Sequence, residues 1–310
     1  SYLIHPSARR KGAASYYALN MQEENARNTF EALFCYMGEK LGTEKSRVSN
    51  WTLGNEVNSC KEWNYSGNMS LSECVANYAQ AFQLLYQGVR RTSGTSRVFI
   101  SLDHCWTASV AGHSGKEFLD QFAAYMNQTA PSMEWNVNYH PYSQPLTRTA
   151  FWSDNSNTTG SAGTKYISMK NIQVLTDYLG SLESQYGKAG GSIRVIIGEL
   201  GYTAVQGNTS AETAQAAALG YGYYIAMFNS RIDAYIVRAY LDDPAETVSG
   251  LYLGVMSKND VKKQSYDVYK YLDTERSLEY MNKYLSTIGI SSWESVIGGF
   301  NAEALPAVDF

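Results

Sequence analysis

The stretch WTLGNEV, residues 51–57, decides how the rest of the chain is interpreted. A short hydrophobic run ends in an amide and carboxylate pair, Asn55-Glu56, and passes directly into the polar segment 58–68. In a parallel barrel, the carboxyl ends of the strands and the loops after them form the face on which active sites lie. We therefore expect Asn55 and Glu56 to lie at such a face.

A second stretch, VIIGELGY at residues 195–202, also delivers one acidic residue, Glu199, at the end of a buried-strand pattern. An ionised carboxylate is costly to bury unless it is paired or hydrogen-bonded, so an acid in this position calls for an explanation. A glutamate that pairs with a neighbouring cation or caps a helix would give the same pattern. Neither Glu56 nor Glu199 alone therefore decides the function.

Short β-branched or aromatic runs alternate along the chain with amphipathic stretches of helical length. This alternation is typical of strand–helix units and a parallel sheet, and it predicts an α/β barrel. A doubly wound sheet shows the same alternation, but it would be expected to carry a Gly-rich phosphate loop, which this sequence lacks. The expected strands are 16–20, 48–57, 97–103, 133–140, 193–202 and 233–241, and the expected helices are 23–41, 70–91, 115–129, 170–186 and 210–229.

The length of 310 residues suits one large barrel as well as two smaller domains. We expect a single barrel domain over residues 1–310, with C-terminal helices over about 262–310. Hydrophobic residues make up 44% and charged residues 17%, which is too apolar for a disordered chain. The net charge of -4 argues against a nucleic-acid partner, because phosphate binding needs concentrated Lys and Arg. No apolar stretch reaches the ~20 residues of a membrane span.

The cysteines and histidines show no metal-binding spacing. Cys35, Cys60, Cys74 and Cys105 are irregularly spaced, and the four histidines are scattered. We therefore expect neither a metal nor a cofactor. Cys60 and Cys74 flank a polar loop and could form a disulfide in an oxidising compartment or remain free thiols.

The two strand-end carboxylates are more informative together than apart. Glu56 and Glu199 lie three strand–helix units apart, so they would come from opposite walls of a barrel and face each other across its mouth. The chemistry that needs such a pair is retaining glycoside hydrolysis, in which carboxyl groups ~5 to 5.5 Å apart act as nucleophile and general acid/base. Mutual repulsion helps to keep the two pKa values apart.

With these motifs the chain resembles the clan A retaining glycoside hydrolases, which are (β/α)8 TIM-type barrels with Asn-Glu at the end of strand 4 and a nucleophilic Glu at the end of strand 7. The resemblance implies that Glu56 is the general acid/base and Glu199 the nucleophile. It also implies that Asn55 bonds to the sugar 2-hydroxyl and to the nucleophile. It numbers the visible strands 3 to 8, so we expect an N-terminally incomplete barrel without strands 1 and 2.

A supporting motif, NVNYHPY at residues 136–142, resembles the clan's His-x-Tyr segment after strand 6. The resemblance implies that Tyr142 or His140 donates a hydrogen bond to Glu199. The alternative is that His140-Pro141 is only a loop turn.

Five further residues are candidates for lining a sugar site, although any one of them could be structural. Aromatic planes can stack on the apolar faces of sugar rings. Where the clan usually offers a Trp after strand 8, this chain has an arginine, which could recognise an anionic sugar or pair with a strand-end acid. The five candidates are Asn20, His104, Trp106, Tyr202 and Arg238.

The resemblance therefore implies an enzyme that hydrolyses β-linked glycosides with retention, acting on an oligosaccharide or polysaccharide. A non-catalytic carbohydrate-binding barrel is the alternative. Several Asn-x-Ser/Thr triplets are weak evidence for secretion, and we expect a secreted or periplasmic location.

Overall fold

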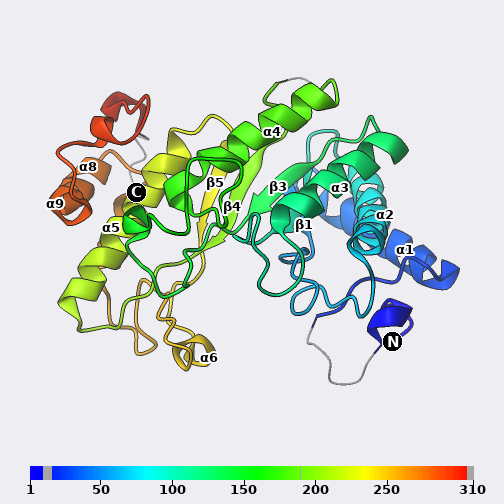
Figure 1. Ribbon diagram of the computed structural model, residues 1–310, viewed down its shortest axis with the longest axis horizontal. Coiled ribbons are helices and arrows are strands. Elements are labelled where there is room, and N and C mark those ends of the chain that lie inside the picture. The colour runs from blue at the N-terminus through cyan, green and yellow to red at the C-terminus, as the bar shows by residue number, and fades with distance from the viewer. Residues whose placement is uncertain (10–15, 189, 306–310) are drawn as a thin grey trace. The chain divides into compact units, whose positions relative to one another are not determined.

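The computed structural model describes residues 1–9, 16–188 and 190–305, and five strands alternate with helices in it (Figure 1). Residues 306–310 of the expected C-terminal helical stretch lie outside the described residues. The strands are β1 (Asn50–Leu53), β2 (Arg97–Leu102), β3 (Asn136–Tyr139), β4 (Val195–Leu200) and β5 (Ile232–Val237). The α-helices are α1 (Glu24–Leu41), α2 (Leu71–Arg90), α3 (Gly115–Thr129), α4 (Gln173–Gln185), α5 (Thr209–Met227), α6 (Pro244–Thr247), α7 (Gln264–Tyr271), α8 (Ser277–Met281) and α9 (Leu285–Ile288). The 3₁₀ helices are η1 (Pro6–Ala8), η2 (Phe151–Ser153), η3 (Met169–Asn171), η4 (Asn282–Tyr284), η5 (Trp293–Ser295) and η6 (Ala302–Ala304).

The strands follow one another across the sheet in chain order, β1-β2-β3-β4-β5. β1 pairs in parallel with β2, with Asn50 opposite Arg97, and β2 pairs in parallel with β3, with Phe99 opposite Asn136. Parallel strands joined through helices confirm the predicted α/β class. A closed barrel of eight strands is not present among the residues that the structure describes.

One predicted strand, residues 16–20, is not a strand in the structure. The segment makes only isolated bridges, from Tyr17 to Tyr65 and from Leu19 to Ile4. Its backbone hydrogen bonds go to loop segments on both sides. Ala18 N donates to Tyr65 O at 2.9 Å, and Ala18 O accepts from His5 N at 2.9 Å. The prediction of six strands is therefore wrong, and five are present in the described parts of the chain.

Local sequence explains where the longest helix begins. Ser70 is the N-cap of α2, and its hydroxyl accepts from Glu73 N at 3.4 Å while Glu73 Oε2 accepts from Ser70 N at 2.7 Å. This reciprocal capping box satisfies two backbone donors that a helix start leaves unpaired. α2 then packs against both α1 and α3, and Figure 1 shows these three helices side by side.

The contacts divide the chain into two compact units. Unit 1 comprises Ser1–Tyr139 and Asp177–Val195, and contains β1, β2 and β3. Unit 2 comprises His140–Thr176 and Ile196–Phe310, and contains nearly all of β4 and the whole of β5. The prediction of one barrel domain over the whole chain stays a prediction.

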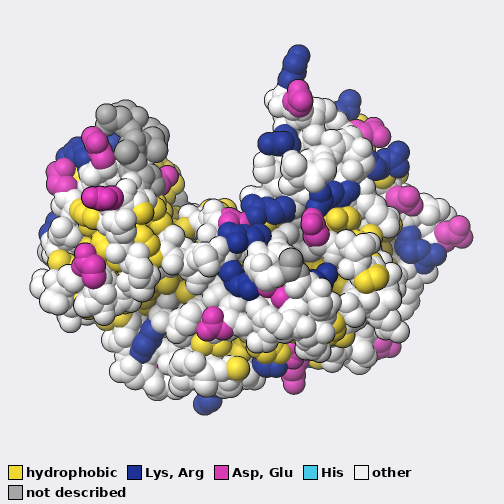
Figure 2. Space-filling view, turned by 90° about the horizontal axis from the view of Figure 1, so that it is seen from above, with side chains coloured by type: hydrophobic (Ala, Val, Ile, Leu, Met, Phe, Trp, Pro, Cys, Tyr) yellow, Lys and Arg dark blue, Asp and Glu magenta, His cyan; other side chains and the backbone are white. Residues whose placement is uncertain are grey.

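Charged side chains of both signs occur on the surface (Figure 2), as expected from the net charge of -4. On the face shown in Figure 2, Lys and Arg side chains lie among Asp and Glu side chains. Among the described helices, none combines the length and the apolar character that crossing a membrane requires.

Candidate functional site

The Asn55-Glu56 pair lies just after β1, separated from it by Gly54, and belongs to unit 1. Glu56 has a φ of 42°, a left-handed conformation that a non-glycine residue rarely adopts. Two hydrogen bonds from the end of β2 hold this turn, since Glu56 N donates to Ser101 Oγ at 3.0 Å and Val57 N donates to Ser101 O at 2.9 Å. A strained backbone of this kind persists only where its surroundings fix it, and such residues cluster at functional sites.

A buried carboxylate, Asp103, follows β2 in the same unit. It accepts from Asn58 Nδ2 at 2.8 Å and from Cys105 N at 2.9 Å, while Asp103 N donates back to Asn58 Oδ1 at 3.1 Å. Burial raises the pKa of Asp103, and the negative charge of Glu56 adds to this effect. Asp103 thus locks the loop after β1 to the end of β2.

Three predicted site residues of unit 1, Trp106, Asn20 and His104, have little or no exposure to solvent. Trp106 is fully buried and packs edge-on against Tyr178, with ring centroids 5.1 Å apart. Asn20 is also fully buried, and its Oδ1 accepts from the backbone N–H groups of residues 22 and 23 ahead of α1. His104 is 9% exposed. These positions favour packing and capping roles for Trp106 and Asn20.

A largely apolar cavity of about 630 Å³ adjoins the end of β1. Asn55 lines it together with Trp63, which is 39% exposed and stacks at a tilt on Tyr16. An aromatic plane beside an amide is a combination that suits sugar recognition. Within unit 1, Trp63 is therefore better placed for stacking than Trp106.

Unit 2 holds the second predicted carboxylate, Glu199, near the end of β4. Tyr142 Oη donates to Glu199 Oε1 at 3.0 Å, which is the contact predicted for Tyr142 or His140. Arg238, just after β5, places its Nε 3.2 Å from the same oxygen. Arg238 N donates to Leu200 O at 2.8 Å, so the backbone itself aligns the arginine with the end of β4.

Arg238 bridges two carboxylates, because its Nη2 also lies 2.7 Å from Glu246 Oε1. Partial burial lowers the pKa of Arg238, but the charges of Glu246 and Glu199 outweigh this effect and leave the pKa raised. Burial raises the pKa of Glu246, and Arg238 offsets part of that rise. The predicted alternative, in which Arg238 pairs with a strand-end acid, describes its contact with Glu199, and Glu246 is an additional partner.

Sequence reasoning missed Glu246, because this residue lies on α6 rather than at the end of a strand. The sequence does carry a helix-start signal there. Asp243 is the N-cap, its Oδ1 accepts from Ala245 N at 2.8 Å, and Pro244 occupies the first turn. That signal places Glu246 in the first turn of a short helix but does not indicate which cation it meets.

The other predicted residues of unit 2 are buried. Tyr202 is 4% exposed and stacks on Phe151 with ring centroids 5.7 Å apart. Burial raises the pKa of Tyr202, so its phenol stays protonated. His140 is 1% exposed, and its carbonyl accepts from Tyr142 N at 2.8 Å in a tight turn. The surroundings of Tyr202 favour a packing role over sugar stacking, and the role of His140 stays a prediction.

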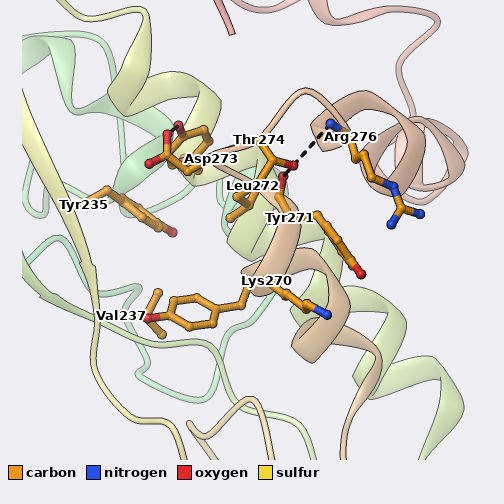
Figure 3. Close-up of a pocket in the computed structure, with 10 residues that line it drawn as sticks. Tyr235, Val237, Lys270, Tyr271, Leu272, Asp273, Thr274 and Arg276 are labelled. Carbon is orange, nitrogen blue, oxygen red and sulfur yellow. Dashed lines mark hydrogen bonds between the residues drawn. The ribbon is translucent and has the colours of Figure 1, made fainter. Parts of the chain in front are cut away.

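A cavity of about 650 Å³ in unit 2 is not associated with these carboxylates. Figure 3 shows Tyr235 and Val237 projecting from β5 toward the segment 270–276, and the cavity lies between them. Tyr235 Oη donates to the carbonyl of Leu219 on α5, so this is the helix-covered face of the strand. Active sites of barrels lie at strand ends instead, so cavity size alone does not locate the chemistry.

One group of described residues could hold a metal ion. Cys60, Cys74 and His113 offer ligand atoms that lie within 4.8 Å of one another, all in unit 1. Both cysteines are buried free thiols. Burial lowers the pKa of His113.

Comparisons with solved structures show what the fold resembles. The β-glycosidase from Thermosphaera aggregans has a TM-score of 0.55 at 16% identity, covering 88% of this chain and 64% of that chain. A glucosidase from Croceicoccus marinus has a TM-score of 0.55 at 12% identity, covering 84% of this chain and 48% of that chain. A family 39 glycoside hydrolase from Bacteroides cellulosilyticus WH2 has a TM-score of 0.51 at 16% identity, covering 83% of this chain and 46% of that chain.

At these identities the likeness is one of fold, and it supports the predicted barrel-type α/β fold. The chain spans between 46% and 64% of the length of these three proteins. No curated protein matches the chain. The family described as "Family of unknown function (DUF5722)" matches residues 1–296.

Proposed function

The chain belongs to the DUF5722 family, a family of unknown function, and we propose from the chain's own residues that it hydrolyses β-linked glycosides with retention of configuration. The observation that carries the proposal is the environment of Glu199. This carboxylate ends a barrel-type strand and accepts from a phenol and a guanidinium, Tyr142 and Arg238. Two fixed donors orient one oxygen and leave the second carboxylate oxygen as the attacking atom.

In the proposed first step, Glu199 attacks the anomeric carbon while the bond to the departing oxygen breaks. Glu56 gives its proton to that oxygen, so the leaving group departs as a neutral alcohol. In the second step, Glu56 takes a proton from water, and the water oxygen displaces Glu199 from the same carbon. Two inversions give net retention, and the mechanism requires the two carboxyl groups to stand ~5 to 5.5 Å apart.

A cavity in unit 1 supports the proposed class of substrate. Asn55 precedes Glu56 and lines a cavity with Trp63, a combination that suits one ring of an oligosaccharide or polysaccharide. The cavity and the glycosidase-like fold support an oligosaccharide or polysaccharide as the proposed class of substrate.

The test is turnover of a panel of aryl β-glycosides and polysaccharides by the purified chain and its variants. Glu199→Gln should reduce kcat by at least ~10³-fold, because it removes the nucleophile. Glu56→Ala should lose activity mainly on poor leaving groups, and azide should restore turnover with a β-glycosyl azide as the product. The matched control is Glu62→Gln, an exposed glutamate on the loop after β1, which should keep normal activity.

A mechanism-based 2-deoxy-2-fluoroglycoside should label Glu199, and peptide mass spectrometry identifies the labelled residue. Full activity in Glu199→Gln, or a label elsewhere, would contradict the proposal. Glycan binding without turnover by the unmodified chain would favour the alternative of a non-catalytic carbohydrate-binding barrel.

A further inference from the structure

We propose that Cys60, Cys74 and His113 form a zinc site that anchors the loop after β1. The three ligand atoms lie within 4.8 Å of one another. Tetrahedral zinc with Zn–S of about 2.3 Å and Zn–N of about 2.0 Å places its ligand atoms roughly 3.5 to 3.8 Å apart. Side-chain adjustments of about 1 Å would therefore close the set around an ion.

The backbone fixes two of the ligands relative to each other. Lys61 N donates to Ala111 O at 2.8 Å, and His113 N donates to Asn58 O at 2.9 Å. Gly112 makes this close approach possible, because a Cβ there would stand 2.4 Å from Cys60 N. The loops that carry Cys60 and His113 are thus held together before any ion binds.

The third ligand comes from a helix. Cys74 lies in the first turn of α2, whose start is fixed by the capping box at Ser70. The Cys74 thiol donates to Ser66 Oγ at 3.1 Å, and Ser66 is buried. When Cys74 is a thiolate, the same hydroxyl can turn and donate to the sulfur, as outer-shell partners of metal ligands do.

The chemistry of the set favours zinc. Thiolate and neutral imidazole are the ligands that zinc takes in proteins, and two thiolates balance the charge of one dication, so a buried ion carries little net charge. The cysteines are buried, whereas His113 is half-buried and leaves an approach for the ion. Water would be the fourth ligand. The spacing of these residues in the sequence does not predict the site, because the fold brings three separate segments together.

Zinc content and cobalt spectra of the full chain test this proposal independently of any glycosidase activity. After reduction and removal of metal, the chain should bind one equivalent of Zn²⁺, and Co²⁺ should give a thiolate-to-metal charge-transfer band. Cys74→Ser and His113→Ala should each weaken Zn²⁺ binding by at least ~100-fold, beyond the ~10- to 100-fold cost of losing an outer-shell partner. Cys35→Ser, which removes a cysteine outside the cluster, is the control and should bind normally.

The other outcomes would overturn the proposal. One is a Cys60–Cys74 disulfide, found by peptide mapping of protein isolated with its thiols alkylated. Another is reduced, folded protein that gives no cobalt band and binds no Zn²⁺. Because His113 is half-buried, His113→Ala should fold even if Cys74→Ser does not. Unchanged Zn²⁺ affinity in His113→Ala would refute the assignment of His113 as a ligand.

Discussion

Asp103 shows how one buried carboxyl group couples the candidate site to stability. Burial raises its pKa in the folded state, while in the unfolded chain an aspartate titrates near ~3.9. The folded state therefore holds this proton more tightly. The stabilisation is complete below the unfolded pKa and is lost as the pH rises through the raised folded-state pKa.

We predict that replacing Asp103 by asparagine removes this pH dependence. The unfolding free energy of the unmodified chain should fall relative to that of Asp103→Asn as the pH rises from ~3.9 through the folded-state pKa. Guanidinium unfolding at a series of pH values measures the difference. Asp177→Asn, at an exposed position, is the control, and a difference that stays constant with pH would contradict the prediction.

Single residues also show where sequence reasoning works for the site. The hydrogen bond to Glu199 was implied by the resemblance of residues 136–142 to the clan's His-x-Tyr segment, which left Tyr142 and His140 as alternative donors, and the structure shows Tyr142 as a donor. The burial of Trp106 and Tyr202 was not predictable, because an aromatic residue after a strand has the same sequence pattern whether it faces solvent or core. The Cys60, Cys74 and His113 cluster depends on contacts between distant segments, which no local spacing reports.

The contact between α1 and α2 depends on two glycines that face each other. A Cβ on Gly38 would stand 2.2 Å from Gly88 O, and a Cβ on Gly88 would stand 2.6 Å from the carbonyl carbon of Phe34. The helix backbones therefore touch at this point. Glycine is unfavourable inside a helix by about 1 kcal/mol relative to alanine, so its presence at both positions reflects the packing and not helix propensity.

We predict that Gly88→Ala destabilises the chain although alanine is the better helix former. The added methyl group has to push the two backbones apart, which should lower the unfolding free energy by about 1 to 3 kcal/mol. Gln87→Ala, at the neighbouring exposed position of α2, should change it by less than about 0.5 kcal/mol. Thermal and denaturant unfolding of both variants provide the measurement, and a more stable Gly88→Ala would show that the helices are not in backbone contact.

Helices were predicted more accurately than strands, for a physical reason. The helix predicted over residues 115–129 matches α3, and the helix predicted over 70–91 matches α2 to within one residue at each end. Caps and periodicity are properties of the local sequence. The segment 16–20 has a strand-like sequence, yet its hydrogen-bond partners are loop segments that the local pattern does not specify.

Across the sheet, burial differs sharply from strand to strand. Every residue of β2 after Arg97 is buried, and β2 is paired on both sides by β1 and β3. In β5 every residue is half-buried or exposed, and Ile236 is 48% exposed. β5 is an edge strand in the strand order. The sheet is thus well protected at β2 and open at β5.

We predict that this contrast appears in amide hydrogen exchange. Backbone amides of residues 97–102 should exchange at least ~10-fold more slowly than those of residues 232–237, because edge and poorly buried strands open at lower free energy. Deuterium uptake in peptides that cover the two strands, measured by mass spectrometry on the folded chain, gives both rates. Equal protection would mean that β5 is covered in solution.

The α/β class of the molecule followed from the alternation of strands and helices in the sequence, and the number of strands did not. Alternation is a local signal, whereas membership of a sheet depends on which neighbour supplies the hydrogen bonds. The likeness in fold to a glucosidase and a β-glycosidase covers 84% and 88% of the chain.

The left-handed backbone at Glu56 lowers the stability of the fold at the position that the proposed mechanism uses as the general acid/base. Glycine would adopt the same φ without the steric penalty of a side chain, a penalty of order 1 kcal/mol or more. The proposed mechanism, however, requires an acid at this position to pass a proton. A laboratory selection for heat tolerance that screens for folding alone would therefore favour Glu56→Gly, which under the proposed mechanism lacks the general acid/base, so such a screen should keep turnover as a second criterion.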